Sequence, residues 1–186
     1  MKSETVMVKN LQLKTGLLAF FYQDFTAKKT RQPQERTMSL PERKDPRRSL
    51  MATIPLGVGM MAALDEVVFH QILAWHHFFD WGTPAFSLLS DGILHSGELI
   101  FFVAGFYLFA DLRRRQAIDR LPAWAGFFFG LGGFQLFDGI VDHKLLRLHQ
   151  VRYVDNLLLY DLTWNAAGLL LLLIGWMLLR RSAGKR

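Results

Sequence analysis

Four long apolar segments, separated and flanked by basic residues, constrain this sequence more than any other feature. The chain carries 22 lysines and arginines, yet none occurs between Leu50 and Leu112. A soluble protein needs charged side chains over such a length of surface, whereas a pair of membrane spans excludes them. The segments are Leu50–Trp75, Pro84–Ala110, Leu121–Leu146 and Val154–Leu179. Each exceeds the ~20 residues that cross a bilayer core about 30 Å thick. We therefore expect an all-α transmembrane fold, a four-helix bundle of two helical hairpins.

The charge pattern also predicts the domain boundaries. Residues 1–49 form a basic N-terminal arm, in which Met38 begins an ordinary cytoplasmic lead into the first span. Two interpretations of the arm are equally open: a flexible segment held near anionic lipid head groups, or an over-long start before Met38. No function is assigned to it. The further domains are a first transmembrane hairpin (50–112), a cytoplasmic loop (113–120), a second transmembrane hairpin (121–180) and a cytoplasmic tail (181–186).

The orientation of the spans follows from where the basic residues fall. Eleven precede residue 50, four lie in 113–120 and four lie from Arg180 onward, whereas only three lie in 144–152. Cytoplasmic loops of membrane proteins carry the excess of lysine and arginine. The sequence therefore predicts a multi-pass protein with both termini in the cytoplasm, and with the loops Phe79–Ala85 and Arg152–Asn156 outside.

The composition excludes several classes of function. Cysteine is absent, so disulfide scaffolds, thiol catalysis and thiolate metal sites are excluded. The sequence has no phosphate-binding loop, dinucleotide fingerprint or nucleophilic serine elbow. The formal net charge of +6 is explained by residues that flank the spans, so nucleic-acid binding is not expected. The sequence names no catalysed reaction.

An internal repeat relates the first span to the third. The stretch GVGMMAALDEVVFHQILAWHH, which starts at Gly57, aligns without a gap on GLGGFQLFDGIVDHKLLRLHQ, which starts at Gly130, at an offset of 73. The polar residues that coincide are Asp65, His70 and His76 with Asp138, His143 and His149. The second and fourth spans match at an offset of 70. The repeat predicts two pseudo-symmetric hairpins related by a two-fold axis along the membrane normal. In the third span, Gly126, Gly130 and Gly133 predict close approach of a neighbouring helix.

The spans carry an unusual layer of polar residues. All six histidines lie between residues 70 and 149. At 1.5 Å per residue, His70 and its counterpart His143 reach the outer half of the membrane, and at 100° per residue His70 lies about 140° round the helix from Asp65. Charged groups within a span cost about 2.5–3.5 kcal/mol on insertion scales, so they are expected to face the interior and to be functional. The candidate ligands are His70, His143, His76, His149, Asp65, Glu66, Asp138, Asp142, Asp91, His95 and Glu98.

Carboxylates and imidazoles without thiolates suit a transition metal ion, and copper, iron and zinc are not distinguished by these residues. Helical bundles build such sites from inward-facing Asp, Glu and His. We expect His70 and His143 to ligate an ion near the two-fold axis, with helix two adding the stripe of Asp91, His95 and Glu98. His76, His77 and His149 carry less weight, because they are expected near the water interface.

Three other functions stay open. A b-type haem with His70 and His143 as axial ligands would make the protein an electron carrier, although the many carboxylates favour a bare metal ion. The same Asp and His residues also suit a proton-coupled transporter or channel element. A non-catalytic assembly subunit is the third alternative, in which the polar residues only hold helices together.

The motifs DEVVFHQILAWHH and FDGIVDHKLLRLHQVR, followed by DGILH and YDLTWN, resemble the bacterial membrane family known as domain of unknown function 2243. The similarity runs from about Leu50 to Leu179. The family pattern D-G-I-x-x-H-Q-I-L-Q-W-H-H falls on Asp65, His70, Gln71, Trp75, His76 and His77, with Glu66 in place of glycine. In the second copy His143, His149 and Arg152 match, while Lys144 and Gln150 replace histidines.

The resemblance implies the topology and supports the chosen residues, but the family has no established activity. It implies a bacterial cytoplasmic (inner) membrane protein. Genes of the family often lie near those for cytochrome oxidase assembly proteins, so the partners that the resemblance implies are the lipid bilayer and respiratory-oxidase assembly or other membrane proteins.

Overall fold

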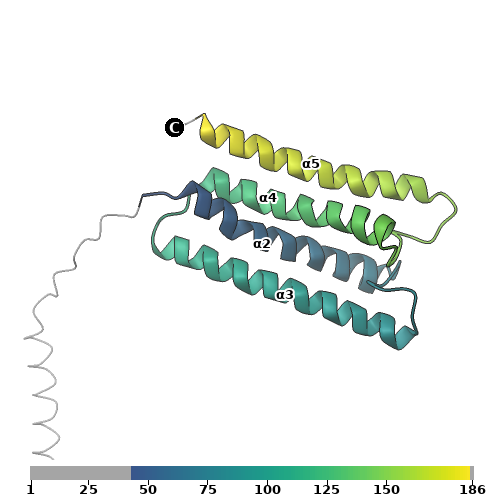
Figure 1. The fold of residues 1–186 in the computed structure, drawn as a ribbon. Helices are drawn as coiled ribbons and strands as arrows, with labels where there is room; N and C mark the ends of the chain where they lie inside the picture. The colour runs from purple at the N-terminus through teal and green to yellow at the C-terminus, as the bar shows by residue number, and fades with distance from the viewer. Residues whose placement is uncertain (1–42, 185–186) are drawn as a thin grey trace, which may run out of the picture. The chain divides into compact units, whose positions relative to one another are not determined.

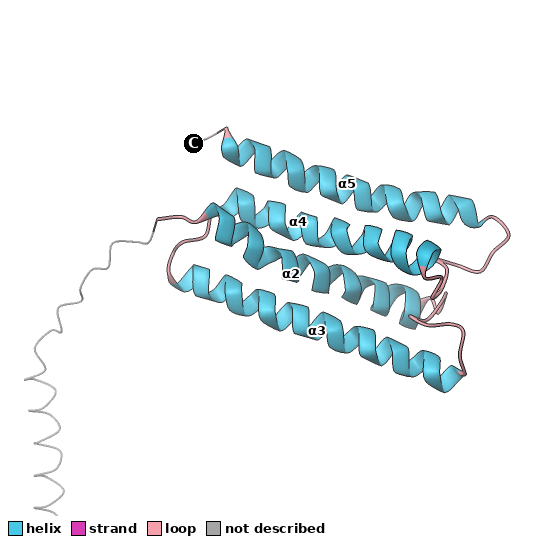
Figure 2. Cartoon of the chain, viewed as in Figure 1, coloured by secondary structure: helices cyan, strands magenta, loops and turns pink. Residues whose placement is uncertain are grey.

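The structure is a computed structural model that describes residues 43–184. The predictions made for the arm before residue 43 and for residues 185–186 lie outside the described residues. Within them the chain is helical, and its only β-type contact is a single bridge between Asp45 and Ile118 (Figure 2). The helices are α2 (Pro46–Asp65), η1 (Glu66–Ile72), α3 (Pro84–Arg114), α4 (Arg120–Phe137), η2 (Asp138–Leu145) and α5 (Leu157–Ala183).

Four helices are long and apolar enough to cross a membrane, which confirms the predicted fold class. They are Pro46–Ile72, Pro84–Arg114, Arg120–Leu145 and Leu157–Ala183. The first begins four residues before the apolar segment because Asp45 caps it. The Asp45 carboxylate accepts a hydrogen bond from the backbone nitrogen of Arg48 at 2.9 Å, and Pro46 follows it at the start of the helix. The exposed apolar side chains of these spans contact the lipid bilayer.

The spans lie in a row in the order α3, α2, α4, α5, with α2 and α4 in the middle (Figure 1). Among the described elements α2 packs against α3 and α4, and α4 packs against α5. Of an apolar 18-residue stretch in each of the two middle spans, 39% and 44% is buried, against 11% and 17% for α3 and α5. Polar residues of α2 and α4 therefore lie inside the protein, while α3 and α5 face lipid over most of their surface.

Glycines let the two middle helices meet backbone to backbone. A Cβ atom on Gly57 would lie 2.9 Å from the Cα of Gly130, and a Cβ on Gly130 would lie 2.8 Å from the Cα of Gly57. Gly126 likewise faces the carbonyl of Leu50 across the same interface. The predicted role is thus correct for Gly126 and Gly130. It is wrong for Gly133, which has open space within 4 Å because it lies on another face of α4.

The two middle helices both widen into π-helix at the same end. At the end of η1 the backbone nitrogen of Leu73 donates a hydrogen bond to the carbonyl oxygen of Val68 at 2.8 Å. At the end of η2 the backbone nitrogen of Leu146 donates one to the carbonyl oxygen of Val141 at 2.7 Å. Each bond spans five residues, the spacing of a π-helix. Two residues after each helix ends, the chain adopts a left-handed conformation, at Ala74 (φ 48°) and Arg147 (φ 52°). Left-handed conformations are uncommon for residues other than glycine, and here they turn the chain back toward the protein.

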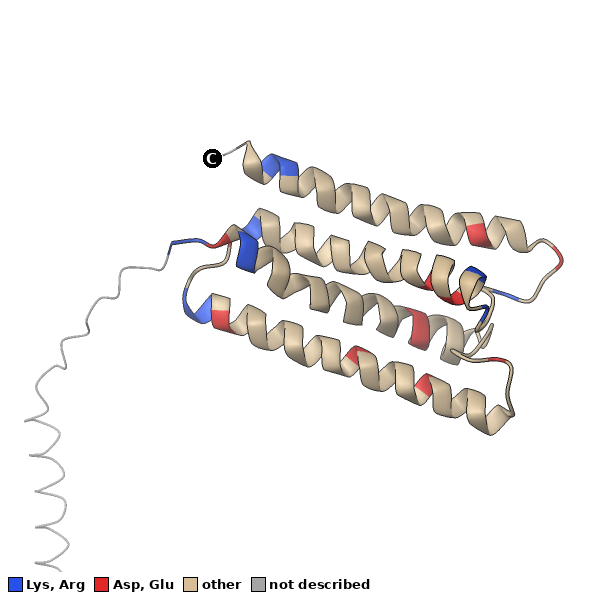
Figure 3. Cartoon of the chain, viewed as in Figure 1, with Lys and Arg blue, Asp and Glu red and all other residues tan. Residues whose placement is uncertain are grey.

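Basic residues gather at one end of the row, where α2 and α4 begin and α3 and α5 end (Figure 3). Apart from Asp111, which pairs with Arg114 and Arg115 at the end of α3, the carboxylates within the helices lie toward the opposite end, where the π-helices and the two connecting loops meet. We call this second end the site end. Only Lys144, Arg147 and Arg152 supply basic residues to it among the described residues.

Candidate metal centre

The π-helical ends bring an aspartate and a histidine of the same helix together. Asp65 and His70 are five residues apart, as are Asp138 and His143. In an α-helix this spacing leaves two side chains about 140° apart, but in a π-helix it is one turn. The Asp65 Oδ2 atom lies 3.5 Å from His70 Nε2, and the Asp138 Oδ2 atom lies 3.2 Å from His143 Nε2. The angles expected from α-helical geometry are therefore wrong for these pairs.

His76 and His149 lie at the middle of the centre. The left-handed turns at Ala74 and Arg147 direct both side chains back between the helices, where they stack at 4.4 Å with an interplanar angle of 13°. Neither lies at the water interface as expected, since both are buried, at 3% and 0% exposure. Of the three histidines expected there, only His77 is half-exposed.

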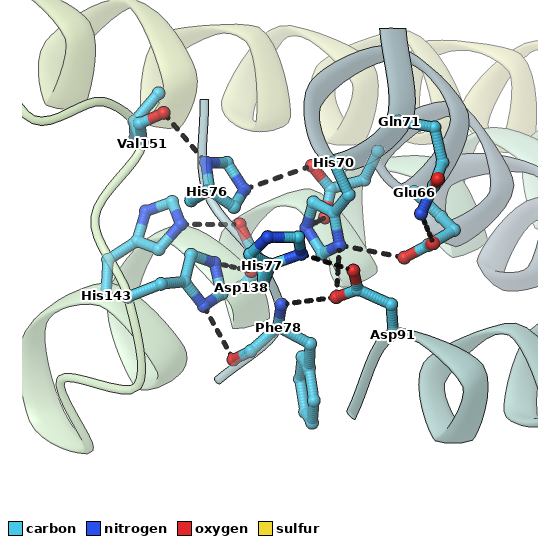
Figure 4. Close-up of polar contacts among 12 residues, drawn as sticks. Glu66, His70, Gln71, His76, His77, Phe78, Asp91, Asp138, His143 and Val151 are labelled. Carbon is cyan, nitrogen blue, oxygen red and sulfur yellow. Dashed lines mark hydrogen bonds and ion pairs between the residues drawn. The ribbon is translucent and has the colours of Figure 1, made fainter. Parts of the chain in front are cut away.

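Backbone carbonyls of the opposite loops orient these two rings. The Nδ1 atom of His76 lies 2.9 Å from the oxygen of Val151, and that of His149 lies 3.0 Å from the oxygen of Phe78 (Figure 4). A carbonyl only accepts, so both Nδ1 atoms carry a proton, and each Nε2 atom presents a lone pair when its ring is neutral. Phe78 and Val151 are themselves 73 residues apart, so the two contacts follow the offset of the predicted repeat.

The four buried imidazoles form one cluster. Ring centroids lie 4.6 Å apart in the pair His70 and His76, and 4.6 Å apart in the pair His143 and His149. Among the described residues, none of the four Nε2 atoms has a hydrogen-bond partner, and neither do the Asp65 Oδ1 and Asp138 Oδ2 atoms. Buried polar atoms are normally paired, so a set of unpaired ones facing a common centre points to a missing ion or water.

The separations between these atoms are those of ligands around one ion. Ligands about 2.0–2.1 Å from a tetrahedral zinc ion lie roughly 3.3 Å apart. Asp138 reaches His143 Nε2 at 3.2 Å and His149 Nε2 at 3.4 Å. Asp65 reaches His70 Nε2 at 3.5 Å and His76 Nε2 at 4.0 Å. The second-hairpin set is therefore tighter than that of Asp65, His70 and His76. Its three residues offer atoms that all lie within 4.8 Å of one another, as do His70, His76 and His149, whereas Asp65 belongs to no such group among the described residues.

Electrostatics differ between the two stacked rings, both of which lie in the loops beyond the spans. Burial, together with nearby imidazoles, lowers the pKa of His76 to about 2. Burial also opposes charge on His149, but its contact with Asp138 outweighs this effect and raises its pKa. His76 is thus neutral at physiological pH, which is the form that binds metals.

A second group of carboxylates lies behind His70. The His70 Nδ1 atom forms a hydrogen bond with Asp91 Oδ1 at 3.1 Å. It also lies 2.7 Å from Glu66 Oε2, which is within ion-pair distance, but the two atoms are not aligned for a hydrogen bond. Asp91 Oδ2 lies 2.6 Å from His77 Nδ1. All three buried residues, Glu66, His70 and Asp91, offer atoms within 4.8 Å of one another.

Two of the predicted ligands pair with each other instead. His95 Nδ1 lies 2.6 Å from Glu98 Oε1, and the His95 side chain is half-exposed. The predicted stripe on helix two is therefore divided, because Asp91 joins His70 and His77. Asp142 is buried but belongs to none of the three groups of ligand atoms found among the described residues.

Sequence reasoning missed one ion pair that distinguishes the hairpins. Lys144 Nζ lies 2.6 Å from Asp161 Oδ2 and donates to Gln150 Oε1 at 2.9 Å. From the sequence, Lys144 is only a departure from the family pattern. The repeat does not predict its partner, because Asp91, the counterpart of Asp161, contacts His70 and His77, whereas Gln71, the counterpart of Lys144, contacts Glu66.

The family model described as "Predicted membrane protein (DUF2243)" matches residues 52–182. The chain belongs to the DUF2243 family. The match includes all of the candidate ligands, and it begins after the predicted arm. No curated protein and no solved structure matches the chain.

In this DUF2243 protein the residues do not fit a haem held between His70 and His143. The rings of His76 and His149 lie between them and stack on each other. A cavity of about 680 Å³ beside the centre reaches Asp65, but most of its lining is apolar, such as Val68 and Leu159, and it contains neither proposed axial ligand. A metal ion without a macrocycle fits the donor atoms that are present.

Proposed function

We propose that this protein binds a transition metal ion in the membrane, at a centre formed by six side chains from the two hairpins. The ligands are Asp65, His70, His76, Asp138, His143 and His149. Metal handling or a redox-linked role in the bacterial inner membrane is the function that follows from such a centre. In the proposed orientation the centre lies in the outer half of the membrane.

One observation carries the proposal. Four buried imidazole Nε2 atoms without hydrogen-bond partners among the described residues face two buried carboxylates. Burying polar atoms without partners costs about 1–3 kcal/mol each, so a cluster of them is stable only if something binds it. The orientation of His76 and His149 by carbonyl oxygens supports a metal in particular, because metal-bound histidines typically donate their other N–H to a carbonyl or carboxylate.

The donor set favours a transition metal over calcium or magnesium. Calcium and magnesium prefer oxygen ligands, whereas imidazole nitrogen suits zinc, copper, iron and nickel. Four nitrogens with two carboxylates also provide enough donors for one ion in each set of three. We therefore expect the set of Asp138, His143 and His149 to fill first, because its atoms are closest together.

Metal analysis of detergent-purified protein tests the proposal. We expect stoichiometric metal at the centre of the wild type, loss of most of it in His70→Ala or His143→Ala, and loss of all metal bound at the centre in a His76→Ala, His149→Ala double variant. His95→Ala is the control, because its half-exposed side chain lies outside the centre. Full occupancy in the double variant would overturn the proposal.

A proton relay is the second candidate function. Half-exposed His77 contacts buried Asp91, which contacts His70, and His70 in turn contacts Asp65. Such a chain of titratable groups leads from the surface to the centre. If this is the function, the wild type holds no stoichiometric metal, and Asp65→Asn or Asp91→Asn abolishes proton transport in vesicles.

A further inference from the structure

Behind His70, the first hairpin carries a cluster that the second hairpin lacks. The first-hairpin cluster consists of Glu66, Asp91 and His77, and it faces the Nδ1 side of the His70 ring (Figure 4). The metal centre lies on the Nε2 side of the same ring. The His70 imidazole therefore separates two groups of carboxylates and presents a nitrogen to each.

The carboxylates of this cluster have no lysine or arginine partner among residues 43–184. Glu66 and Asp91 are buried, at 4% and 2% exposure, and their ion-pair contacts are with imidazoles. The Glu66 Oε2 atom has no hydrogen-bond partner although it lies 2.7 Å from His70 Nδ1. Two buried carboxylates so close together are costly unless a cation neutralises them.

In the second hairpin a lysine neutralises the carboxylate that corresponds to Asp91. At the offsets of the predicted repeat, glycine (Gly139) replaces Glu66, Lys144 replaces Gln71, and Gln150 replaces His77. The Lys144 ammonium lies 2.6 Å from Asp161, the counterpart of Asp91. The first hairpin has no such lysine. Gln71 stands at the corresponding position, is neutral, and donates a hydrogen bond to Glu66 Oε1 at 2.8 Å.

We propose that the first-hairpin cluster is a second cation site, at which a divalent transition metal ion binds before it passes to the metal centre. The ligands are Glu66 Oε2, Asp91 Oδ1 and His70 Nδ1, which lie within 4.8 Å of one another. Binding at Nδ1 releases its proton to water. This inference rests on the proposed function for its final step, the transfer to the centre, but not for the binding of the first ion.

The position of the cluster suits a loading site. His77 is half-exposed at the site end, and its Nδ1 contacts buried Asp91 at 2.6 Å. An ion that arrives from water therefore meets His77 first, and it exchanges its water ligands for the buried ligands of the cluster one at a time. Carboxylates beside a low-dielectric wall also raise the local concentration of cations and their association rates, by about 10–1000-fold in favourable cases. The Lys144–Asp161 pair closes the corresponding route in the second hairpin.

The test transfers that lysine to the first hairpin. Full-length protein in detergent, stripped of metal, is mixed with Co²⁺, and the visible absorption and the bound cobalt are followed over time. Gln71→Lys places an ammonium beside Glu66, the residue that Gln71 contacts at 2.8 Å. We expect one ion fewer at saturation and loading of the centre slower by about tenfold or more. Gln71→Leu is the matched control, since it removes the same amide without adding charge, and should load as the wild type does.

Two further variants keep the test decisive if Gln71→Lys does not fold. His77→Gln copies Gln150 at an exposed position and should slow loading without lowering the final occupancy of the centre. Lys144→Gln, in the second hairpin, should not slow the loading of the centre. Equal ion numbers and equal rates in Gln71→Lys and Gln71→Leu, or unchanged loading in His77→Gln, would overturn the inference, because protons rather than an ion then neutralise the cluster.

The outcome for the metal centre is measured separately. In the His76→Ala, His149→Ala double variant the first-hairpin ion should remain, and Gln71→Lys should still remove it. If that double variant binds as much Co²⁺ as the wild type, the proposed function fails while the second site stands. If only the centre binds Co²⁺, the second site fails while the proposed function stands.

Discussion

At the scale of single residues, three of the four central imidazoles are held by the nitrogen that faces away from the centre. Carbonyl oxygens hold His76 and His149, and Asp91 holds His70. His143 differs, because its Nδ1 has no hydrogen-bond partner among the described residues. Three of the four rings are therefore fixed in the tautomer that offers Nε2 to a metal, which lowers the cost of ordering the ligands when the ion binds.

The two aspartates should contribute unequally to metal affinity. Asp138 lies 3.2 and 3.4 Å from its two imidazole nitrogens, whereas Asp65 lies 3.5 and 4.0 Å from its own. We expect Asp138→Asn to weaken binding by at least the roughly 10–100-fold that loss of a supporting group costs, and Asp65→Asn to weaken it less. Competition titration with a chelator measures both. A larger loss in Asp65→Asn would show that the first-hairpin set binds the tighter ion.

At the scale of helices, the centre depends on how closely α2 and α4 approach. Gly57 and Gly130 meet at their Cα atoms, and Thr53 donates a hydrogen bond to the carbonyl of Ala123 at 2.6 Å across the same interface. Such contacts replace hydrophobic association, which has little driving force between helices in lipid. The widened π-helical ends then place the histidines of both helices between them.

Enlarging one glycine tests this interface. A Cβ at Gly130 would meet the backbone of Ile54 and Gly57, so Gly130→Ala forces the helices apart and should lower the free energy of unfolding by about 1–3 kcal/mol. Gly133→Ala, in the same helix but with nothing within 4 Å, should leave stability unchanged or raise it by about 0.5–1 kcal/mol. Thermal or denaturant unfolding in detergent measures both. Equal losses would mean that helix flexibility, rather than contact, decides the effect.

At the scale of the whole molecule, hydropathy and charge sufficed to predict the four spans, because lipid imposes a length and an apolar composition on any helix that crosses it. The ligand residue types were also predicted, but not their arrangement. Predicted angles assumed α-helix through His70 and beyond, whereas the chain forms π-helix from Glu66 and leaves the helix before His76. No periodicity signals such a change. The two-fold repeat stays a prediction, supported by contacts that recur at its offset, such as those of His76 and His149.

The last prediction concerns which side of the membrane the site end faces. The absence of cysteine makes single-cysteine labelling clean, because only the introduced thiol reacts. Thr83, in the loop before α3, and Ala183, at the end of α5, are both exposed, whereas the neighbouring Ser182 is buried and unsuitable. The excess of basic residues beside Ala183 predicts that this end is cytoplasmic. A membrane-impermeant maleimide should therefore label Thr83→Cys in intact cells and Ala183→Cys only after permeabilisation.

This labelling also decides where metal would reach the protein. Thr83 lies in the same loop as His77, so its side of the membrane is the side from which the first-hairpin cluster is accessible. Labelling of Thr83→Cys in intact cells would mean that ions bind from outside, before any cytoplasmic metal carrier can supply them. Labelling of Ala183→Cys in intact cells would invert the protein, and the centre would then take its metal from the cytoplasm.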